Sequence, residues 1–238
     1  MARPDIGARE RELVNLVLDS DVLALGPLAT EFEERLAAVA GRRFGVSCSS
    51  GTAGLHMVVR SLGIGPGDEV ITTPFSFVAS ANCLLYEGAT PRFVDIEPDS
   101  LGLDPAEVAA AAGPNTVGVL AVHVFGRPSR IGELSGLADA RGWHFIEDAC
   151  EALGSTAAGR PMGSFGNASV FAFYPPNQVT TGEGGMVVTD DPDQAEDLRS
   201  LRNPGRDTDG TWQPHVQLGY TYRLDELSAA VGVAQLER

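Results

Sequence analysis

The sequence predicts an α/β protein with a mostly parallel sheet that helices cover on both faces. The first observation is an alternation, from residue 44 to residue 150, of short apolar segments with periodic segments of helical length. Such alternation is typical of parallel strands joined by helices. The second is composition: 43% of the 238 residues are hydrophobic and 28 are glycine, which is ordinary for a globular α/β chain. The length suits one large domain over residues 1–238, or one domain plus a piece of another.

The N-terminal part is expected to form two amphipathic helices, over residues 7–20 and 28–40. In the second, apolar Phe32 and Leu36 recur at helical spacing, and Gly41 follows as a stop signal.

Strands and helices then alternate as far as residue 150. The apolar segments are expected to be strands, and the periodic segments between them are expected to be helices. The strands are 44–48, 70–74, 90–96, 117–124 and 144–150, and the helices are 49–63 (which begins as a turn), 76–88, 105–112 and 131–142.

The pattern changes after residue 155. Two strands, 169–175 and 184–191, are joined by a short Gly-rich segment and not by a long helix. A helix over 194–202, a polar loop over 203–221 and a final helix over 222–238 complete the chain.

Charge and cysteine usage exclude several classes of function. A net charge of −15 disfavours nucleic acid and anionic membrane surfaces as partners. No apolar run approaches the ~18 residues that a membrane span needs, and the polar N-terminus does not resemble a signal peptide. Cys48, Cys83 and Cys150 show no paired or metal-like spacing, which indicates reduced cysteines and a cytoplasmic protein.

All 17 basic residues are arginine. The chain therefore has no side chain with a primary amine.

The segment SSGTAGL, residues 49–55, lies between an expected strand and an expected helix. Free backbone N–H groups and the helix dipole make such a turn a natural seat for a phosphate, although a simple N-cap gives the same pattern.

Three further residues are candidates for a site: Asp148, Phe77 and His123. Asp148 ends an apolar strand, where a carboxylate can hold a pyridine nitrogen protonated, or can cap the next segment. Phe77 offers an aromatic plate for a planar ring, or a core side chain. His123 is expected to be a structural residue.

For the chain as a whole, a Rossmann-type nucleotide-binding module is an alternative function, but no GxGxxG follows the first strand.

The order of these motifs resembles the DegT/DnrJ/EryC1/StrS family of sugar aminotransferases that depend on pyridoxal phosphate (PLP). The resemblance runs from Pro4 to Arg238 and includes the segments SSGTAGLHM, VITTPFSFVASAN, IEDACEALGS, FAFYP, TTGEGGMVVTDD and GYTYRLDELSAAVGVAQLER. It implies the large domain of the aspartate aminotransferase fold (fold type I), with a seven-stranded type of sheet, an N-terminal helical segment and no C-terminal small domain.

The resemblance also implies site residues, substrates and assembly. The family transfers an amino group, usually from glutamate to a keto-sugar nucleotide, in antibiotic or surface-polysaccharide pathways. It works as a homodimer whose sites lie at the subunit interface. The implied cofactor contacts are Gly51, Thr52 and Ala53 to the phosphate, Phe77 on the ring, Asp148 at the ring nitrogen and Glu151 beside the phenolic oxygen.

Three positions depart from the family pattern. The lysine that binds the cofactor as a Schiff base corresponds to Asn177. A serine that many members place five residues earlier is Ala172, and an asparagine that reaches the partner's phosphate is Thr221.

An asparagine amide is neither nucleophilic nor basic, so Asn177 can replace the lysine neither as a covalent anchor nor as a general base. Loss of the base alone costs on the order of 10²–10⁴ in rate.

Three interpretations follow from this replacement. The chain is a family member that has lost transamination, or it is a mutated or truncated representative of an active enzyme. The third interpretation is a protein that binds PLP, its amine form pyridoxamine phosphate (PMP), or a sugar nucleotide for other chemistry. Any cofactor is expected to bind noncovalently.

Overall fold

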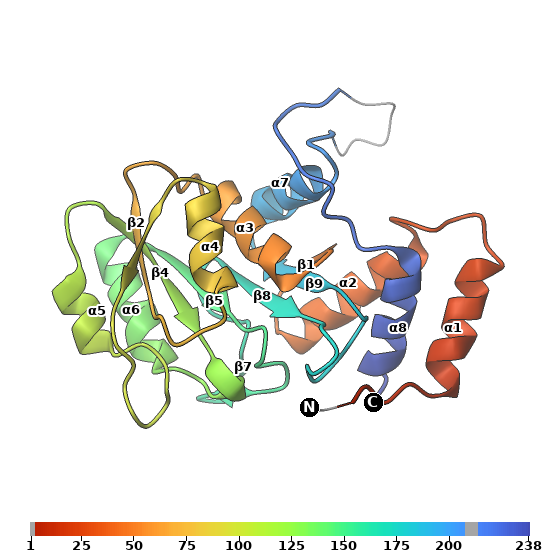
Figure 1. Ribbon diagram of the computed structural model, residues 1–238, viewed down its shortest axis with the longest axis horizontal. Coiled ribbons are helices and arrows are strands. Elements are labelled where there is room, and N and C mark those ends of the chain that lie inside the picture. The colour runs from red at the N-terminus through yellow and green to blue at the C-terminus, as the bar shows by residue number, and fades with distance from the viewer. Residues whose placement is uncertain (1–2, 208–213) are drawn as a thin grey trace.

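The computed structural model describes residues 3–207 and 214–238, so part of the loop expected over 203–221 lies outside the described residues. A seven-stranded sheet runs in the order β1-β9-β8-β5-β4-β2-β3, with helices on both faces (Figure 1). The strands are β1 (Phe44–Cys48), β2 (Glu69–Thr72), β3 (Thr90–Phe93), β4 (Thr116–Val122), β5 (His144–Asp148), β8 (Ala168–Ala172) and β9 (Gly185–Thr189).

One strand runs against the rest of the sheet. β9 pairs antiparallel with both β1 and β8, whereas β8, β5, β4, β2 and β3 pair in parallel. The α/β class and the mostly parallel, seven-stranded sheet are therefore confirmed.

Helices pack against both faces of the sheet and form two separate apolar cores. One core lies beneath α3, α4 and α7, and the other contains side chains from α1, α2, α5, α6 and α8. The helices are α1 (Ala8–Leu18), α2 (Pro27–Val39), α3 (Gly51–Ser61), α4 (Ala79–Tyr86), α5 (Pro105–Ala111), α6 (Ile131–Arg141), α7 (Pro192–Arg202) and α8 (Glu226–Leu236).

Several boundaries differ from those expected. The final helix starts at Glu226, not at residue 222, because the Asp225 side chain caps it by accepting the N–H of Ser228 at 2.9 Å. The strand expected over 169–175 ends at Ala172, where its ladder with β9 ends.

The structure contains a short hairpin and a short turn that the sequence did not predict. A hairpin joins β6 (Thr156–Ala157) to β7 (Arg160–Pro161), and a 3₁₀ turn, η1, covers Val124–Gly126. Elements of two or three residues are too short to give a periodic signal.

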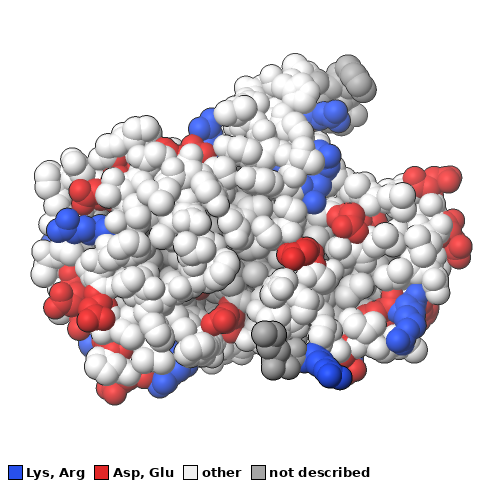
Figure 2. Space-filling view, in the orientation of Figure 1, with Lys and Arg blue, Asp and Glu red and all other residues white. Residues whose placement is uncertain are grey.

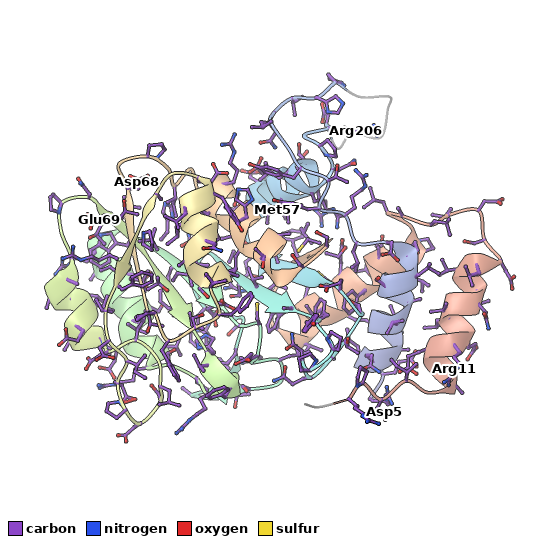
Figure 3. The ribbon with its side chains drawn as sticks, viewed as in Figure 1. Asp5, Arg11, Met57, Asp68, Glu69 and Arg206 are labelled. Carbon is purple, nitrogen blue, oxygen red and sulfur yellow. The ribbon has the colours of Figure 1, made fainter. Side chains whose placement is uncertain are left out.

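The two ends of the chain lie side by side. Arg238 donates to the Asp5 carboxylate at 2.9 Å, and Figure 3 shows Asp5 close to the C-terminal end of the ribbon. In the same view Met57 lies on α3 within the interior, where it is fully buried.

Charged side chains are unevenly placed on the face seen in Figure 2, where uncharged residues cover α4 and its surroundings and charges gather toward the edges. No helix in the described residues is long and apolar enough to cross a membrane.

A buried carboxylate joins β4, β5 and the segment before β8. Glu147 is fully buried, and its carboxylate accepts hydrogen bonds from Gly163 N–H at 3.0 Å, Phe165 N–H at 2.6 Å and Ser169 Oγ at 2.8 Å. His123 Nε2 lies 3.1 Å from the same carboxylate. Because every partner is a donor, the site requires an acceptor-only group.

We expect Glu147→Gln to lower the free energy of unfolding by about 2–4 kcal/mol, because an amide N–H₂ would face buried N–H donors. Urea unfolding monitored by circular dichroism measures the change. Glu133→Gln is the matched control: Glu133 is exposed and, among the residues that the structure describes, its side chain bonds only to Arg130, so the change should cost less than about 1 kcal/mol. Equal midpoints for the two variants would contradict the assigned role.

Candidate functional site

A cavity of about 910 Å³ opens at the carboxyl ends of the parallel strands. Its walls come from the segments that follow β1, β2, β4, β5 and β8, and loops at this edge are the usual ligand-binding region of an open α/β sheet. The lining includes six of the residues expected in the site: Gly51, Thr52, Phe77, Asp148, Glu151 and Asn177.

The first turn of α3 forms one wall. Ser50 accepts the N–H of Ala53 at 3.1 Å, which leaves the N–H groups of Gly51 and Thr52, both of them lining residues, at the positive end of the helix. A Cβ on Gly51 would lie 2.8 Å from Ala172 Cβ, so glycine is needed for close packing against β8. Backbone donors at such an end suit a phosphate.

Asp148 is the buried carboxylate of the cavity. It is 6% exposed, and its Oδ2 accepts the Ser80 hydroxyl at 2.6 Å while Oδ1 accepts the N–H of Cys150 at 3.3 Å. Ser80 is itself 2.6 Å from Ser76 Oγ. These bonds fix the orientation of the carboxylate.

Ser80 is a site residue that the sequence analysis missed. It lies on α4, and it meets Asp148 across 68 positions of sequence. Ser80 belongs to the same motif as Phe77, but a serine in an apolar helix gives no local signal that it contacts a carboxylate on a distant strand.

Phe77 and Glu151 stand at the rim. Phe77 is 76% exposed, so its ring is free to cover a planar ligand. Glu151 Oε2 accepts the N–H of Phe125 at 2.6 Å. Phe125 has a φ of +56°, a left-handed conformation that is uncommon for a bulky residue. The Glu151 bond therefore helps to hold a strained turn beside the cavity.

Asn177 lies in the loop between β8 and β9. Its Nδ2 donates to the carbonyl of Ala172 at 2.7 Å, and its backbone N–H donates to the carbonyl of Tyr174 at 2.9 Å. Since a carbonyl only accepts, the nitrogen of the amide must face Ala172. Within the described residues Oδ1 has no hydrogen-bond partner and stays available as an acceptor at the cavity wall.

His123 is structural, as expected, although it borders the cavity. It is 1% exposed, with Nε2 against Glu147 and Nδ1 accepting the N–H of Ser129 at 3.3 Å. This pattern places the ring proton on Nε2 and leaves neither nitrogen for a ligand.

Thr221 and Ala53 are not among the lining residues. Ala53 lies one position deeper in α3, with its N–H taken by Ser50. Thr221 is exposed, while its neighbours Tyr220 and Tyr222 stack on each other with ring centroids 4.9 Å apart.

The two tyrosines beside Thr221 pack against His56. Both rings contact His56, with centroid distances of 4.8 Å for Tyr220 and 5.9 Å for Tyr222. Thr221 between them is exposed, whereas both tyrosines are partly buried. The structure thus brings six expected site residues together and leaves Thr221 exposed, outside the cavity lining.

The charged groups of the lining are all acidic. They are Asp148, Glu151 and Glu183, and no arginine lines the cavity within the described residues. In the part of the chain that the structure describes, no group of three or more His, Cys, Asp or Glu side chains is placed to hold a metal ion.

Comparison with known proteins assigns the family. The model of the DegT/DnrJ/EryC1/StrS aminotransferase family matches residues 4–238. The chain belongs to this family. It is a family of aminotransferases that bind PLP or PMP, so the cavity residues stand in the fold type I setting that the sequence motifs indicated.

Two curated relatives are each 38% identical to the chain. GDP-perosamine synthase of Caulobacter vibrioides aligns over 240 residues, which cover 100% of this chain and 64% of that protein. The spore coat polysaccharide biosynthesis protein SpsC of Bacillus subtilis aligns over 244 residues, 99% of this chain and 63% of that protein. The chain therefore spans less than two thirds of the length of these relatives.

Solved structures show the same fold. DesI, determined in the presence of its TDP-sugar product, superposes with a TM-score of 0.90 at 41% identity, covering 99% of this chain and 59% of DesI. NtdA of Bacillus subtilis, with bound cofactor PMP, superposes with a TM-score of 0.90 at 28% identity, covering 98% of this chain and 54% of NtdA.

The cysteines should react slowly in the folded protein. Burial raises the pKa of Cys48 to about 12, and burial, reinforced by Asp148, raises the pKa of Cys83 and Cys150 well above their usual value. The reactive thiolate is therefore scarce at pH 8. We expect Ellman's reagent to titrate the three thiols at least about tenfold more slowly in native protein than in urea. A rapid native burst would contradict this.

Proposed function

We propose that this chain is a sugar-nucleotide aminotransferase homologue of sugar or polysaccharide biosynthesis whose transaminase activity is lost or strongly impaired. The observation that carries the proposal is a cavity that gathers Gly51, Thr52, Phe77, Asp148 and Glu151 but has Asn177 where the family resemblance places the lysine. The names of the relatives, a GDP-perosamine synthase and a polysaccharide biosynthesis protein, support the substrate class.

The residues present fit the ring and phosphate of PLP but not its covalent attachment. The first turn of α3 offers N–H donors for a phosphate, Asp148 is a buried carboxylate held in one orientation, and Phe77 is an exposed ring. The chain has no lysine to form the covalent bond. When bound, PLP would supply an electron-withdrawing ring that stabilises negative charge on a substrate carbon.

Each retained residue would have a defined task in this proposal. Asp148 would hold a proton on the ring nitrogen, and Ser80 fixes the orientation of that carboxylate through the 2.6 Å bond. Gly51 and Thr52 would bind the phosphate through backbone N–H groups, and Phe77 would exclude water from one face of the ring. By the family resemblance, Glu151 would contact the phenolic oxygen.

Asn177 explains the loss of activity. Its amide nitrogen is already committed to the carbonyl of Ala172, and an amide neither attacks a carbonyl carbon nor takes a proton near neutral pH. A substrate proton therefore has no base at this position.

Two alternatives remain within the same proposal. One is an active PLP-dependent aminotransferase, of which this chain is a mutated or truncated representative. The other is a noncovalent role, in which the chain binds PLP, PMP or a sugar nucleotide for other chemistry; the retention of Gly51, Thr52, Phe77, Asp148 and Glu151 in the cavity lining favours this role over general decay of the site.

The proposal includes a cytoplasmic homodimer. Thr221 is exposed, and it stands where the family resemblance expects a residue that reaches the partner's phosphate.

Borohydride reduction of the protein mixed with PLP tests the missing anchor. We expect no pyridoxyl group on any side chain of the parent, because none carries a primary amine. Asn177→Lys should become labelled at position 177, as detected by peptide mass spectrometry, because the new amine emerges at the cavity wall.

Asn177→Met is the matched control, since it adds length without an amine and should stay unlabelled. Failure of Asn177→Lys to acquire label, despite native circular dichroism, would show that the cavity no longer binds the cofactor. Half-transamination with glutamate by Asn177→Lys is the stiffer test of restored chemistry.

Multi-angle light scattering tests the assembly. We expect a dimer or larger species at micromolar concentration, because several aromatic side chains around the cavity are exposed in one copy: Phe75, Phe77, Phe125 and Tyr174. A stable monomer would contradict the dimer.

A further inference from the structure

We propose that the cavity selects the amine form of the cofactor, PMP, over the aldehyde form, PLP. This inference rests on the proposed function, since it names which form the same site prefers. It follows from three properties of the lining: its charge, the free acceptor of Asn177, and the absence of a covalent anchor.

The charge of the lining is the first argument. Asp148, Glu151 and Glu183 are carboxylates, and no arginine stands among the lining residues that the structure describes. His123 cannot serve as a cationic donor to a ligand, because both of its nitrogens are bonded within the protein. A site with this balance attracts a ligand that carries an additional positive charge.

The free acceptor of Asn177 is the second argument. Nδ2 of Asn177 is held by the carbonyl of Ala172, so the free atom of the amide is Oδ1, an acceptor. An ammonium group donates up to three hydrogen bonds, whereas an aldehyde oxygen only accepts. Amine and amide oxygen are therefore complementary, and aldehyde and amide oxygen are not.

The replacement of lysine by asparagine favours PMP over PLP in two ways. A lysine would bind the aldehyde covalently and would repel an ammonium group of like charge. Asn177 removes both effects. The phosphate and the pyridine ring are common to PLP and PMP, so their interactions largely cancel when the two forms are compared.

Equilibrium titration of the parent protein with each form tests the preference. We expect a dissociation constant for PMP at least about tenfold below that for PLP at pH 7.5, which corresponds to one charge-assisted hydrogen bond. Isothermal calorimetry or quenching of intrinsic fluorescence gives both constants. With no lysine in the chain, PLP cannot be consumed by side-chain amines during the titration.

Variants at position 177 separate the causes. Asn177→Leu keeps a similar volume without the acceptor and should bring the two constants closer together. Asn177→Lys should reverse the preference: its amine joins the aldehyde carbon of PLP with release of water, and its charge repels PMP.

Variants of two other carboxylates test the role of charge. Glu183→Gln, in the cavity lining, should weaken the binding of PMP more than the binding of PLP. Glu133→Gln, exposed on α6, should change neither dissociation constant.

The outcomes distinguish this inference from the proposed function. Equal or tighter binding of PLP by the parent would overturn the preference and leave a cofactor site. Binding of neither form at millimolar concentration would defeat both, because the cavity would then not be a cofactor site. An unchanged ratio in Asn177→Leu would remove Asn177 as its cause.

Discussion

The arrangement of the site depends on the end of β5, where two neighbouring carboxylates face opposite sides of the sheet. Glu147 points into the protein and bonds to the segment between β7 and β8 and to the end of β4. Asp148, one residue further, borders the cavity and bonds to α4. Side-chain alternation along the strand makes the two roles inseparable. Whatever holds Glu147 in place also sets the position of Asp148.

The fold was largely predictable from the sequence because the strands of the main sheet and the helices that cover it carry apolar patterns bounded by stop signals. The boundaries at Asp225 and Ala172 were not, since they depend on a cap and on the extent of a ladder. The site was predictable where its residues stand in motifs at strand ends, as Gly51 and Asp148 do. Ser80 and the pairing of His123 with Glu147 were not predictable, because tertiary packing brings these side chains together.

Arginines at buried positions have structural roles. Arg42 donates to the carbonyl of Gly163 at 2.7 Å and to Asp190 at 2.9 Å, and Arg202 bonds to Glu33 at 2.5 Å beside Ser47. Arginine suits these multiple, buried contacts because its donors form a rigid fork. Arginine keeps its proton near neutral pH and does not attack carbon, so it cannot take the place of a lysine as a nucleophile. A lysine-free chain can therefore be well folded without having a side chain that forms a Schiff base.

The antiparallel pairing of β8 with β9 has a consequence for changes at position 177. Because the two strands form a hairpin, the connection that carries Asn177 begins where the ladder ends, at Ala172 and Gly185. A change of residue at position 177 leaves every rung of the ladder intact. The residue at position 177 can thus change while the sheet stays under its own, separate constraint. Chains with different side chains at this position can share the same sheet.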